Sequence, residues 1–284
     1  ITIVPTKTAV KLAIQNNKER DITIVGCGFA AVALGISLKK AGLNNFTILE
    51  RSNEIGGVWR ENTYPGAACD VPSRLYSFSF EQDYPWSLRY APQKEIFEYL
   101  KHCIDKYSLT RHIRLGMEVT KATYDDDAAT WSVATKSGEE ITTDIFISAV
   151  GLFNNPSIPD IPSQDTFKGS QFHSARWDHS VELDGKTIAS IGSGASAIQY
   201  VPELAKISKQ LNVFQRTPQH IFAKGDRANA QQDQSTTLWQ KLSHRRERLQ
   251  LFTRFEKNSR RRSSEELTQK SAEAFEKYIH SLVD

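Results

Sequence analysis

Two glycine-rich segments have the composition and spacing of phosphate-binding loops. The first, residues 26–31 (GCGFAA), follows a β-rich run and precedes a helical pattern. Its glycines let the backbone turn tightly and approach a pyrophosphate, while the helix N-terminus offers unpaired N–H groups and a positive dipole end. An acid that accepts from ribose hydroxyls is expected about 20 residues later, and Glu50 lies 22 residues after Gly28. This pattern predicts a dinucleotide site; the alternative is a glycine-rich turn in an ordinary α/β unit, with Glu50 a solvated strand end.

The second segment repeats this arrangement with a different charge. Residues 192–197 (GSGASA) again lie between a β-rich run and a helical pattern. The next predicted strand, residues 211–215, is followed by Arg216 and Thr217 instead of an acid. Arginine and a hydroxyl would bind a 2′-phosphate that an acid would repel. The second site is therefore predicted to take NADP(H) rather than NAD(H), unless Arg216 is only a solvated strand end.

Further elements must position these two loops. Residues 46–50 read as a strand, residues 94–107 as a helix, and residues 118–124, 131–135 and 141–148 as alternating strands. Strand–loop–helix units of this kind predict an α/β fold with parallel sheets, and antiparallel strands within 118–148. One chain with an acidic first site and an arginine-tipped second site suggests FAD in the first and NADPH in the second, an arrangement that moves hydride to flavin.

The domain boundaries follow from changes in composition. Residues 1–153 are predicted to be the first part of an FAD-binding domain, and residues 154–162, with three prolines, a linker. Residues 163–222 would begin an NADPH-binding domain. Residues 223–284 are predicted to be helical, with two helices in the basic stretch 241–262 and a further helical pattern in 263–284.

Composition excludes several classes of protein. The 284 residues are 39% hydrophobic and 24% charged, with a net charge of +3, which indicates a globular chain and requires neither nucleic acid nor an anionic membrane as partner. The three cysteines, Cys27, Cys69 and Cys103, form no CxxC pair, which argues against a disulfide reductase. No window approaches a membrane span and no signal peptide is visible, so a cytoplasmic location is expected.

Two further segments allow either a purely structural or a functional interpretation. Residues 56–72 mix glycines, aromatic residues and two acids, Glu61 and Asp70, so they form either a structured surface loop or a surface for a flat ring. Residues 167–178 contain His173, which is either a general base or, more commonly, a hydrogen-bonding residue.

Residues 167–178 also carry a family resemblance. Their sequence, FKGSQFHSARWD, matches the pattern FxGxxxHxxxW(P/D) at Phe167, Gly169, His173, Trp177 and Asp178. In this respect the chain resembles class B flavoprotein monooxygenases, specifically the Baeyer–Villiger monooxygenases. The run GGVWRENTYPGAACD and the residues QRTP at 215–218 resemble the same family. The resemblance therefore implies an α/β fold with two Rossmann-like dinucleotide-binding domains, for FAD and NADP. It also implies that residues 223–284 are a helical insertion that is truncated in this sequence.

The resemblance implies an activity and a set of site residues. NADPH would reduce FAD, and a flavin peroxide formed with O2 would insert one oxygen atom next to a ketone carbonyl, giving an ester or lactone. Asp70 would lie beside the flavin and orient an arginine that this sequence does not contain, while His173 and Trp177 would couple domain motion to turnover. The implied FAD contacts are Gly26, Gly28, Phe29, Ala30, Glu50, Arg51, Gly57, Val58, Trp59, Asn62, Asp70, Tyr76 and Val119. The implied NADP contacts are Ala68, Cys69, Asp70, Gly192, Ser193, Gly194, Ala195, Ser196, Ala197, Arg216 and Thr217.

Two alternatives remain at this point. In the first, the chain is not a complete Baeyer–Villiger enzyme but a truncated, catalytically incomplete nucleotide-binding remnant or one part of a split flavoprotein. In the second, it belongs to an N- or S-oxygenating flavin monooxygenase. The presence of Trp177 and Asp178, where those oxygenases usually carry another aromatic residue, favours the Baeyer–Villiger branch. No metal site is predicted.

Overall fold

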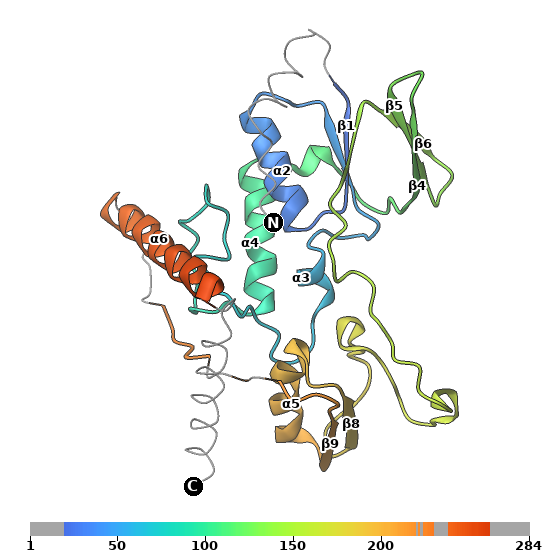
Figure 1. Cartoon of the computed structure of the whole chain (residues 1–284), viewed down its shortest axis with the longest axis vertical. Helices are drawn as coiled ribbons and strands as arrows, with labels where there is room; N and C mark the ends of the chain where they lie inside the picture. The colour runs from blue at the N-terminus through green and yellow to red at the C-terminus, as the bar shows by residue number, and fades with distance from the viewer. Residues whose placement is uncertain (1–19, 220, 222–223, 230–237, 262–284) are drawn as a thin grey trace. The chain divides into compact units, whose positions relative to one another are not determined.

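The computed structural model describes residues 20–219, 221, 224–229 and 238–261. The chain divides into two compact units, drawn in Figure 1. Unit 1 comprises Ile1–Thr63 and Ile96–Gly169, and unit 2 comprises Tyr64–Glu95 and Ser170–Asp284, each within the described ranges. We treat the two units separately.

A parallel sheet forms the centre of unit 1. Its strand order is β3-β2-β1-β7, with β1 (Ile22–Val25) between β2 (Phe46–Leu49) and β7 (Ile145–Ser148), and β3 (Ile113–Arg114) at the edge. All three pairings are parallel. Because β1 pairs with β2 on one side and with β7 on the other, the loops after these strands meet at one edge of the sheet.

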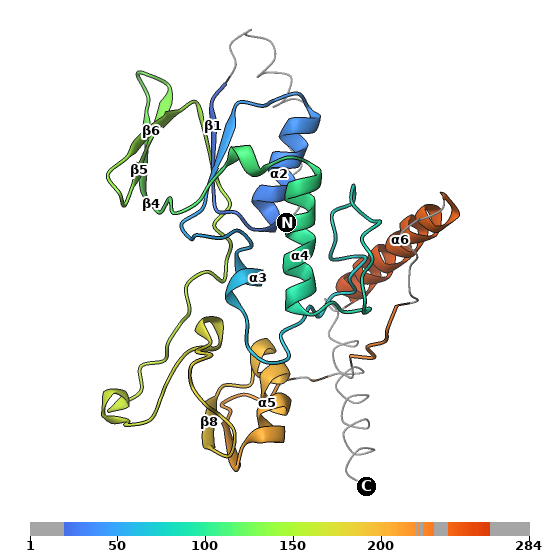
Figure 2. The same cartoon turned by 180° about the vertical axis from the view of Figure 1, so that it is seen from behind.

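Helices cover one face of this sheet (Figures 1 and 2). Helix α2 (Phe29–Lys40) follows β1 directly, and α4 (Gln93–Lys106) is amphipathic, with Ile96, Tyr99, Leu100, Cys103 and Ile104 buried. The α-carbon of Gly35 lies so close to β2 that an added β-carbon would meet Ile48, Leu109 and Phe46, each at 3.3 Å. Unit 1 also contains the short helices α3 (Val58–Glu61) and η1 (Thr110–His112).

Unit 1 also contains an antiparallel sheet, which packs against the parallel sheet. Its order is β4-β5-β6, formed by β4 (Val119–Asp125), β5 (Thr130–Thr135) and β6 (Glu140–Thr143). A cluster of buried Leu49, Met117 and Val133 joins it to the parallel sheet.

The single strand expected over residues 141–148 is wrong in one respect. The segment forms two strands, and β6 pairs with β5 while β7 pairs with β1. The break falls at Asp144, whose carboxylate accepts from the Asp21 N–H at 2.9 Å and from Arg20 at 3.3 Å. A polar residue anchored in this way ends one strand and lets the chain enter the second sheet.

Unit 2 contains a second strand–loop–helix segment. Strand β8 (Thr187–Ile191) runs parallel to β9 (Gln210–Phe214), and α5 (Ala195–Ile207) connects them. A short helix, η3 (Ser174–Arg176), precedes β8, whereas η2 (Gln164–Thr166) lies in unit 1.

The basic C-terminal stretch folds as one helix where two were expected. Helix α6 spans Leu238–Arg261, since no glycine or proline interrupts this segment. Its large apolar residues Trp239, Leu242, Leu249, Phe252 and Phe255 are all exposed. The pattern expected over 263–284 lies outside the described residues. None of the helices in the described ranges is long and apolar enough to cross a membrane.

The compact units group the chain differently from the predicted domains. Residues 64–95 belong to unit 2, although the sequence placed them in the domain 1–153. The physical reason is hydrogen bonding to later parts of unit 2. Tyr64 and Ala68 bond to Gln199 of α5. Arg248 of α6 donates to the carbonyl oxygens of Arg74, Leu75 and Ser77. The segment 154–162 has no helix or strand.

Candidate functional site

The first glycine loop turns directly off the end of β1. Gly26 has φ +98°, and a β-carbon there would lie 2.6 Å from the Ala149 carbonyl oxygen. Gly28 approaches Gly57, since a β-carbon on Gly57 would lie 3.4 Å from the Gly28 α-carbon. The Gly56 N–H also donates to the Cys27 carbonyl at 2.8 Å. These contacts hold the loop in the position that the sequence predicted, between β1 and the N-terminus of α2.

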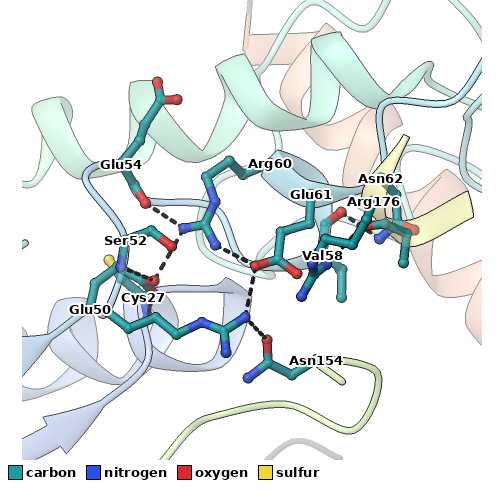
Figure 3. A network of polar contacts seen from close by, with 12 residues as sticks. Cys27, Glu50, Ser52, Glu54, Val58, Arg60, Glu61, Asn62, Asn154 and Arg176 are labelled. Carbon is teal, nitrogen blue, oxygen red and sulfur yellow. Dashed lines mark hydrogen bonds and ion pairs between the residues drawn. The ribbon is translucent and has the colours of Figure 1, made fainter. Parts of the chain in front are cut away.

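Glu50, at the end of β2, is buried beneath this loop and bound from three sides (Figure 3). One carboxylate oxygen accepts from the Cys27 N–H at 2.9 Å. The other accepts from the Ser52 N–H at 3.0 Å and from the Arg60 guanidinium at 3.1 Å. Glu50 therefore fastens the glycine loop to the end of β2.

Arg60 is a partner of Glu50 that the sequence did not predict. Besides Glu50 it contacts Glu61 at 2.7 Å and the Glu54 carbonyl. No spacing rule connects a strand end with an arginine in a later helix, so only the fold reveals this pair. Burial raises the pKa of the Cys27 thiol to about 12, with the Glu50 charge adding to the effect, so the thiol stays protonated.

The other residues predicted to contact FAD in unit 1 lie on several of its elements. Phe29 at the start of α2 stacks on Tyr99, with ring centroids 6.2 Å apart. Arg51 bonds to Glu61 and Asn154, at 3.1 and 2.7 Å. Val58 and Trp59 lie on α3. Asn62, which ends this helix, donates from its side-chain amide to the Val58 carbonyl. Val119 begins β4 and packs against the cluster around Leu49.

The second glycine loop has the same backbone course in unit 2. Gly192 has φ +100° and its N–H donates to the Phe214 carbonyl at 2.8 Å, while Gly194 caps α5. Apart from the adjacent residues of the chain, no heavy atom in the described part of the protein lies within 4 Å of a β-carbon built on either glycine. Arg216 and Thr217, just past β9, are exposed, and the Ser193 hydroxyl contacts the Thr217 carbonyl at 3.4 Å.

Both helices begin without a protein anion. Neither α2 nor α5 has a side-chain N-cap bond or an acidic residue in its first turn. The first N–H groups of each helix and its positive dipole end therefore face the glycine loop and are suited to a phosphate.

The residues of the FxGxxxHxxxW pattern have local structural partners. In unit 1, a β-carbon on Gly169 would meet the Phe167 ring at 2.6 Å. In unit 2, His173 caps η3 because its Nδ1 accepts from the Ala175 N–H at 3.1 Å. Asp178 accepts from the Ser180 N–H and hydroxyl, which lowers the pKa of this carboxyl.

Trp177 belongs to an aromatic cluster in unit 2. Its ring centroid lies 5.1 Å from that of Phe172, 5.6 Å from Tyr200 and 6.5 Å from Tyr64. Tyr200 is on α5, so Trp177 packs against the helix that follows the second glycine loop.

Asp70 and Tyr76 belong to unit 2, unlike the other predicted FAD contacts. Asp70 is exposed, and it follows Ala68 and the buried Cys69. Tyr76 is half-buried in a turn in which its N–H donates to the Pro72 carbonyl at 2.9 Å. Burial raises the pKa of the Cys69 thiol to about 11. Across the described ranges no group of acidic, histidine and cysteine side chains could hold a metal ion.

Comparison with known proteins agrees with this geometry. The family described as flavin-binding monooxygenase-like matches residues 19–229. The chain is 43% identical over 207 residues to a Baeyer–Villiger monooxygenase of Streptomyces coelicolor, a match that covers 73% of this chain and 40% of that protein. It therefore spans less than half of that relative's length.

Solved structures give the same assignment. The cyclohexanone monooxygenase of Rhodococcus sp. Phi1 bound to NADP+ superposes with a TM-score of 0.70 at 36% identity, covering 80% of this chain and 42% of that one. The OTEMO complex with FAD and NADP gives 0.71 at 29% identity, covering 81% and 44%. These matches confirm the resemblance and the α/β class predicted from the sequence, and the chain belongs to the flavin-binding monooxygenase-like family.

Proposed function

We propose that this chain provides the FAD- and NADPH-binding part of a Baeyer–Villiger type monooxygenase. The observation that carries the proposal is that each glycine loop is paired with a different charged residue. Glu50 follows β2, the strand after the first loop, and Arg216 follows β9, the strand after the second loop. In domain terms, residues 1–153 would contain the start of the FAD domain and residues 163–222 the start of the NADPH domain, joined by the linker 154–162.

The residues of unit 1 suit the adenine dinucleotide half of FAD. The uncapped N-terminus of α2 would receive the pyrophosphate beside Gly28. A carboxylate has about four acceptor sites, so the three contacts of Glu50 leave capacity for a ribose hydroxyl. Arg60 donates to this carboxylate and fixes its orientation.

The residues of unit 2 suit NADPH. The open surface at Gly192 and Gly194 allows a pyrophosphate to approach the backbone. The Arg216 guanidinium and the Thr217 hydroxyl would bind the 2′-phosphate, which distinguishes NADPH from NADH.

The bound flavin would supply hydride acceptance and oxygen activation, the chemistry that no side chain of this chain provides. The relatives are named for oxygen insertion, and one solved neighbour is a cyclohexanone monooxygenase, so a ketone is the proposed substrate. Asp70, exposed on unit 2, would orient a cationic side chain near the ketone.

A product assay tests the proposal. The chain is incubated with FAD, NADPH, O2 and cyclohexanone, and the lactone is measured by gas chromatography. Lactone that requires FAD, NADPH and O2 supports the full proposal. NADPH oxidation that yields only hydrogen peroxide would contradict oxygen insertion by this chain while leaving nucleotide binding in place.

A further inference from the structure

The segment that carries Asp70 is hydrogen-bonded on one side to another part of unit 2. The Gln93 N–H donates to the Ala67 carbonyl at 2.8 Å, and the Cys69 N–H donates to the Ala91 carbonyl at 3.0 Å. These two bonds flank an antiparallel bridge between Ala68 and Pro92. In such a pair the N–H and C=O of the central residue point away from the partner strand, so Ala68 must find its partners on the opposite side.

A single side chain provides those partners. The Gln199 amide nitrogen donates to the Ala68 carbonyl at 2.8 Å, and the Gln199 amide oxygen accepts from the Ala68 N–H at 3.2 Å. The same oxygen accepts from the Tyr64 hydroxyl at 2.9 Å. The amide of Gln199 thus bonds the Ala68 peptide groups as the backbone of a neighbouring strand would.

Backbone packing reinforces this contact from a second position. Gly66 has φ +77°, and a β-carbon there would lie 2.8 Å from the backbone carbonyl oxygen of Gln199. Only glycine allows the loop to lie this close to α5. Gln199 is the fifth residue of α5, the helix that begins at the second glycine loop.

We propose that Gln199 is a positioning residue that couples the NADPH loop to the segment Ala68–Asp70. It would hold Asp70 in register with α5, so that nucleotide bound at the N-terminus of α5 would also stabilise the Asp70 segment. This inference rests on the proposed function for its nucleotide, but the hold of Gln199 on Ala68 is independent of any ligand.

Cys69 is a natural reporter of this hold. It is buried, at 3% exposure, and its raised pKa leaves little reactive thiolate in the closed state. Labelling of Cys69 by a maleimide therefore reports local opening. Cys27 and Cys103 are buried in unit 1 and serve as internal references.

The test measures the labelling rate of each cysteine by mass spectrometry in the full chain. Gln199→Glu keeps the acceptor but places an oxygen against the Ala68 carbonyl, so Cys69 should label about tenfold faster, with Cys27 and Cys103 unchanged. Gly66→Ala, which forces the loop away from α5, should give the same signature. Gln210→Glu makes the same chemical change on exposed β9 and should have no effect.

The outcomes separate the inference from the proposed function. Equal Cys69 rates in Gln199→Glu and Gln210→Glu, or a parallel rise at all three cysteines, would overturn the positioning role. In the wild type, NADP+ should slow Cys69 labelling, and this protection should weaken in Gln199→Glu at saturating nucleotide. A wild type in which NADP+ binds but leaves Cys69 unaffected would overturn the coupling, whereas absence of NADP+ binding would contradict the proposed function alone.

Discussion

Glu50 and Arg216 have opposite charges at corresponding places, one beyond β2 and one beyond β9, and their surroundings also differ. Glu50 is 5% exposed and bonded to Arg60 and two backbone N–H groups. Arg216 is exposed. The first residue is therefore built into the fold and the second is available to a ligand, which leads to two different predictions.

Arg60→Ala should destabilise unit 1 by about 2 kcal/mol, because it leaves the buried Glu50 carboxylate without its cation. Arg51→Ala is the matched control, since Arg51 pairs with Glu61 at 36% side-chain exposure and such a pair contributes at most about 1 kcal/mol. Urea unfolding of both variants measures the difference. Equal losses in the free energy of unfolding would show that the Glu50–Arg60 pair stabilises unit 1 no more than the exposed Arg51–Glu61 pair.

Arg216→Ala should weaken NADP+ binding by about tenfold to a hundredfold, since a charge-assisted contact to the 2′-phosphate is lost. NAD+ binding should not change. Lys209→Ala, which removes an exposed cation just before β9, is the control. Calorimetric titration of the wild type and the two variants measures the affinity for NADP+ and for NAD+. An equal loss of affinity for NAD+ and NADP+ in Arg216→Ala would argue against 2′-phosphate recognition.

At the scale of elements, the strand–loop–helix segments depend on a few backbone positions. Gly26→Ala introduces a β-carbon 2.6 Å from a backbone oxygen at φ +98°, so we expect a cost of about 3 kcal/mol or more and loss of flavin binding. Gly42→Ala, at φ +81° with nothing within 4 Å, should cost only about 1 kcal/mol. Thermal unfolding and flavin fluorescence test the pair, and a fully stable Gly26→Ala variant would contradict the described loop.

The packing of η1 on β2 should make unit 1 sensitive to acid. The His112 Nδ1–H donates to the Phe46 carbonyl at 3.0 Å, and Nε2 accepts from Arg111 at 3.1 Å. Burial, with the Arg111 and Lys39 charges, lowers the pKa of His112 below its ordinary value of 6.5. The unfolded chain then binds the proton more readily, so this stability is present above pH 6.5 and declines as the pH falls below it.

Hydrogen exchange of the β2 amides, corrected for intrinsic rates, measures this effect at pH 7.5 and 5.5. Protection should fall at pH 5.5 in the wild type and in the exposed control His179→Asn. In His112→Gln the dependence should flatten. An unchanged dependence in His112→Gln would assign the acid sensitivity to other groups.

Local patterns predicted most of the elements but not the contacts between them. Residues 46–50 and 94–107 were expected as strand and helix, and the structure has β2 and α4 within one residue of these bounds. The division at Asp144 was missed because its cause, the bonds to Arg20 and Asp21, is more than 120 residues away. The Arg60–Glu50 contact spans only ten residues and the Gln199–Ala68 contact spans 131, but both were missed because each joins segments that no periodicity relates.

At the scale of the whole molecule, the described chain has two dinucleotide-type segments in two units, while its S. coelicolor relative is covered over only 40% of its length. We expect unit 1 nevertheless to contain enough of the site to bind FAD. The contacts of Gly26, Gly28 and Glu50 are made entirely within unit 1, which supports this claim.

The visible spectrum of the purified chain, with the flavin identified after denaturation, tests that claim most directly. We predict near-stoichiometric FAD, either retained through purification or taken up on addition, and loss of bound FAD in Gly26→Ala. A folded, colourless protein that takes up no added FAD would contradict the account.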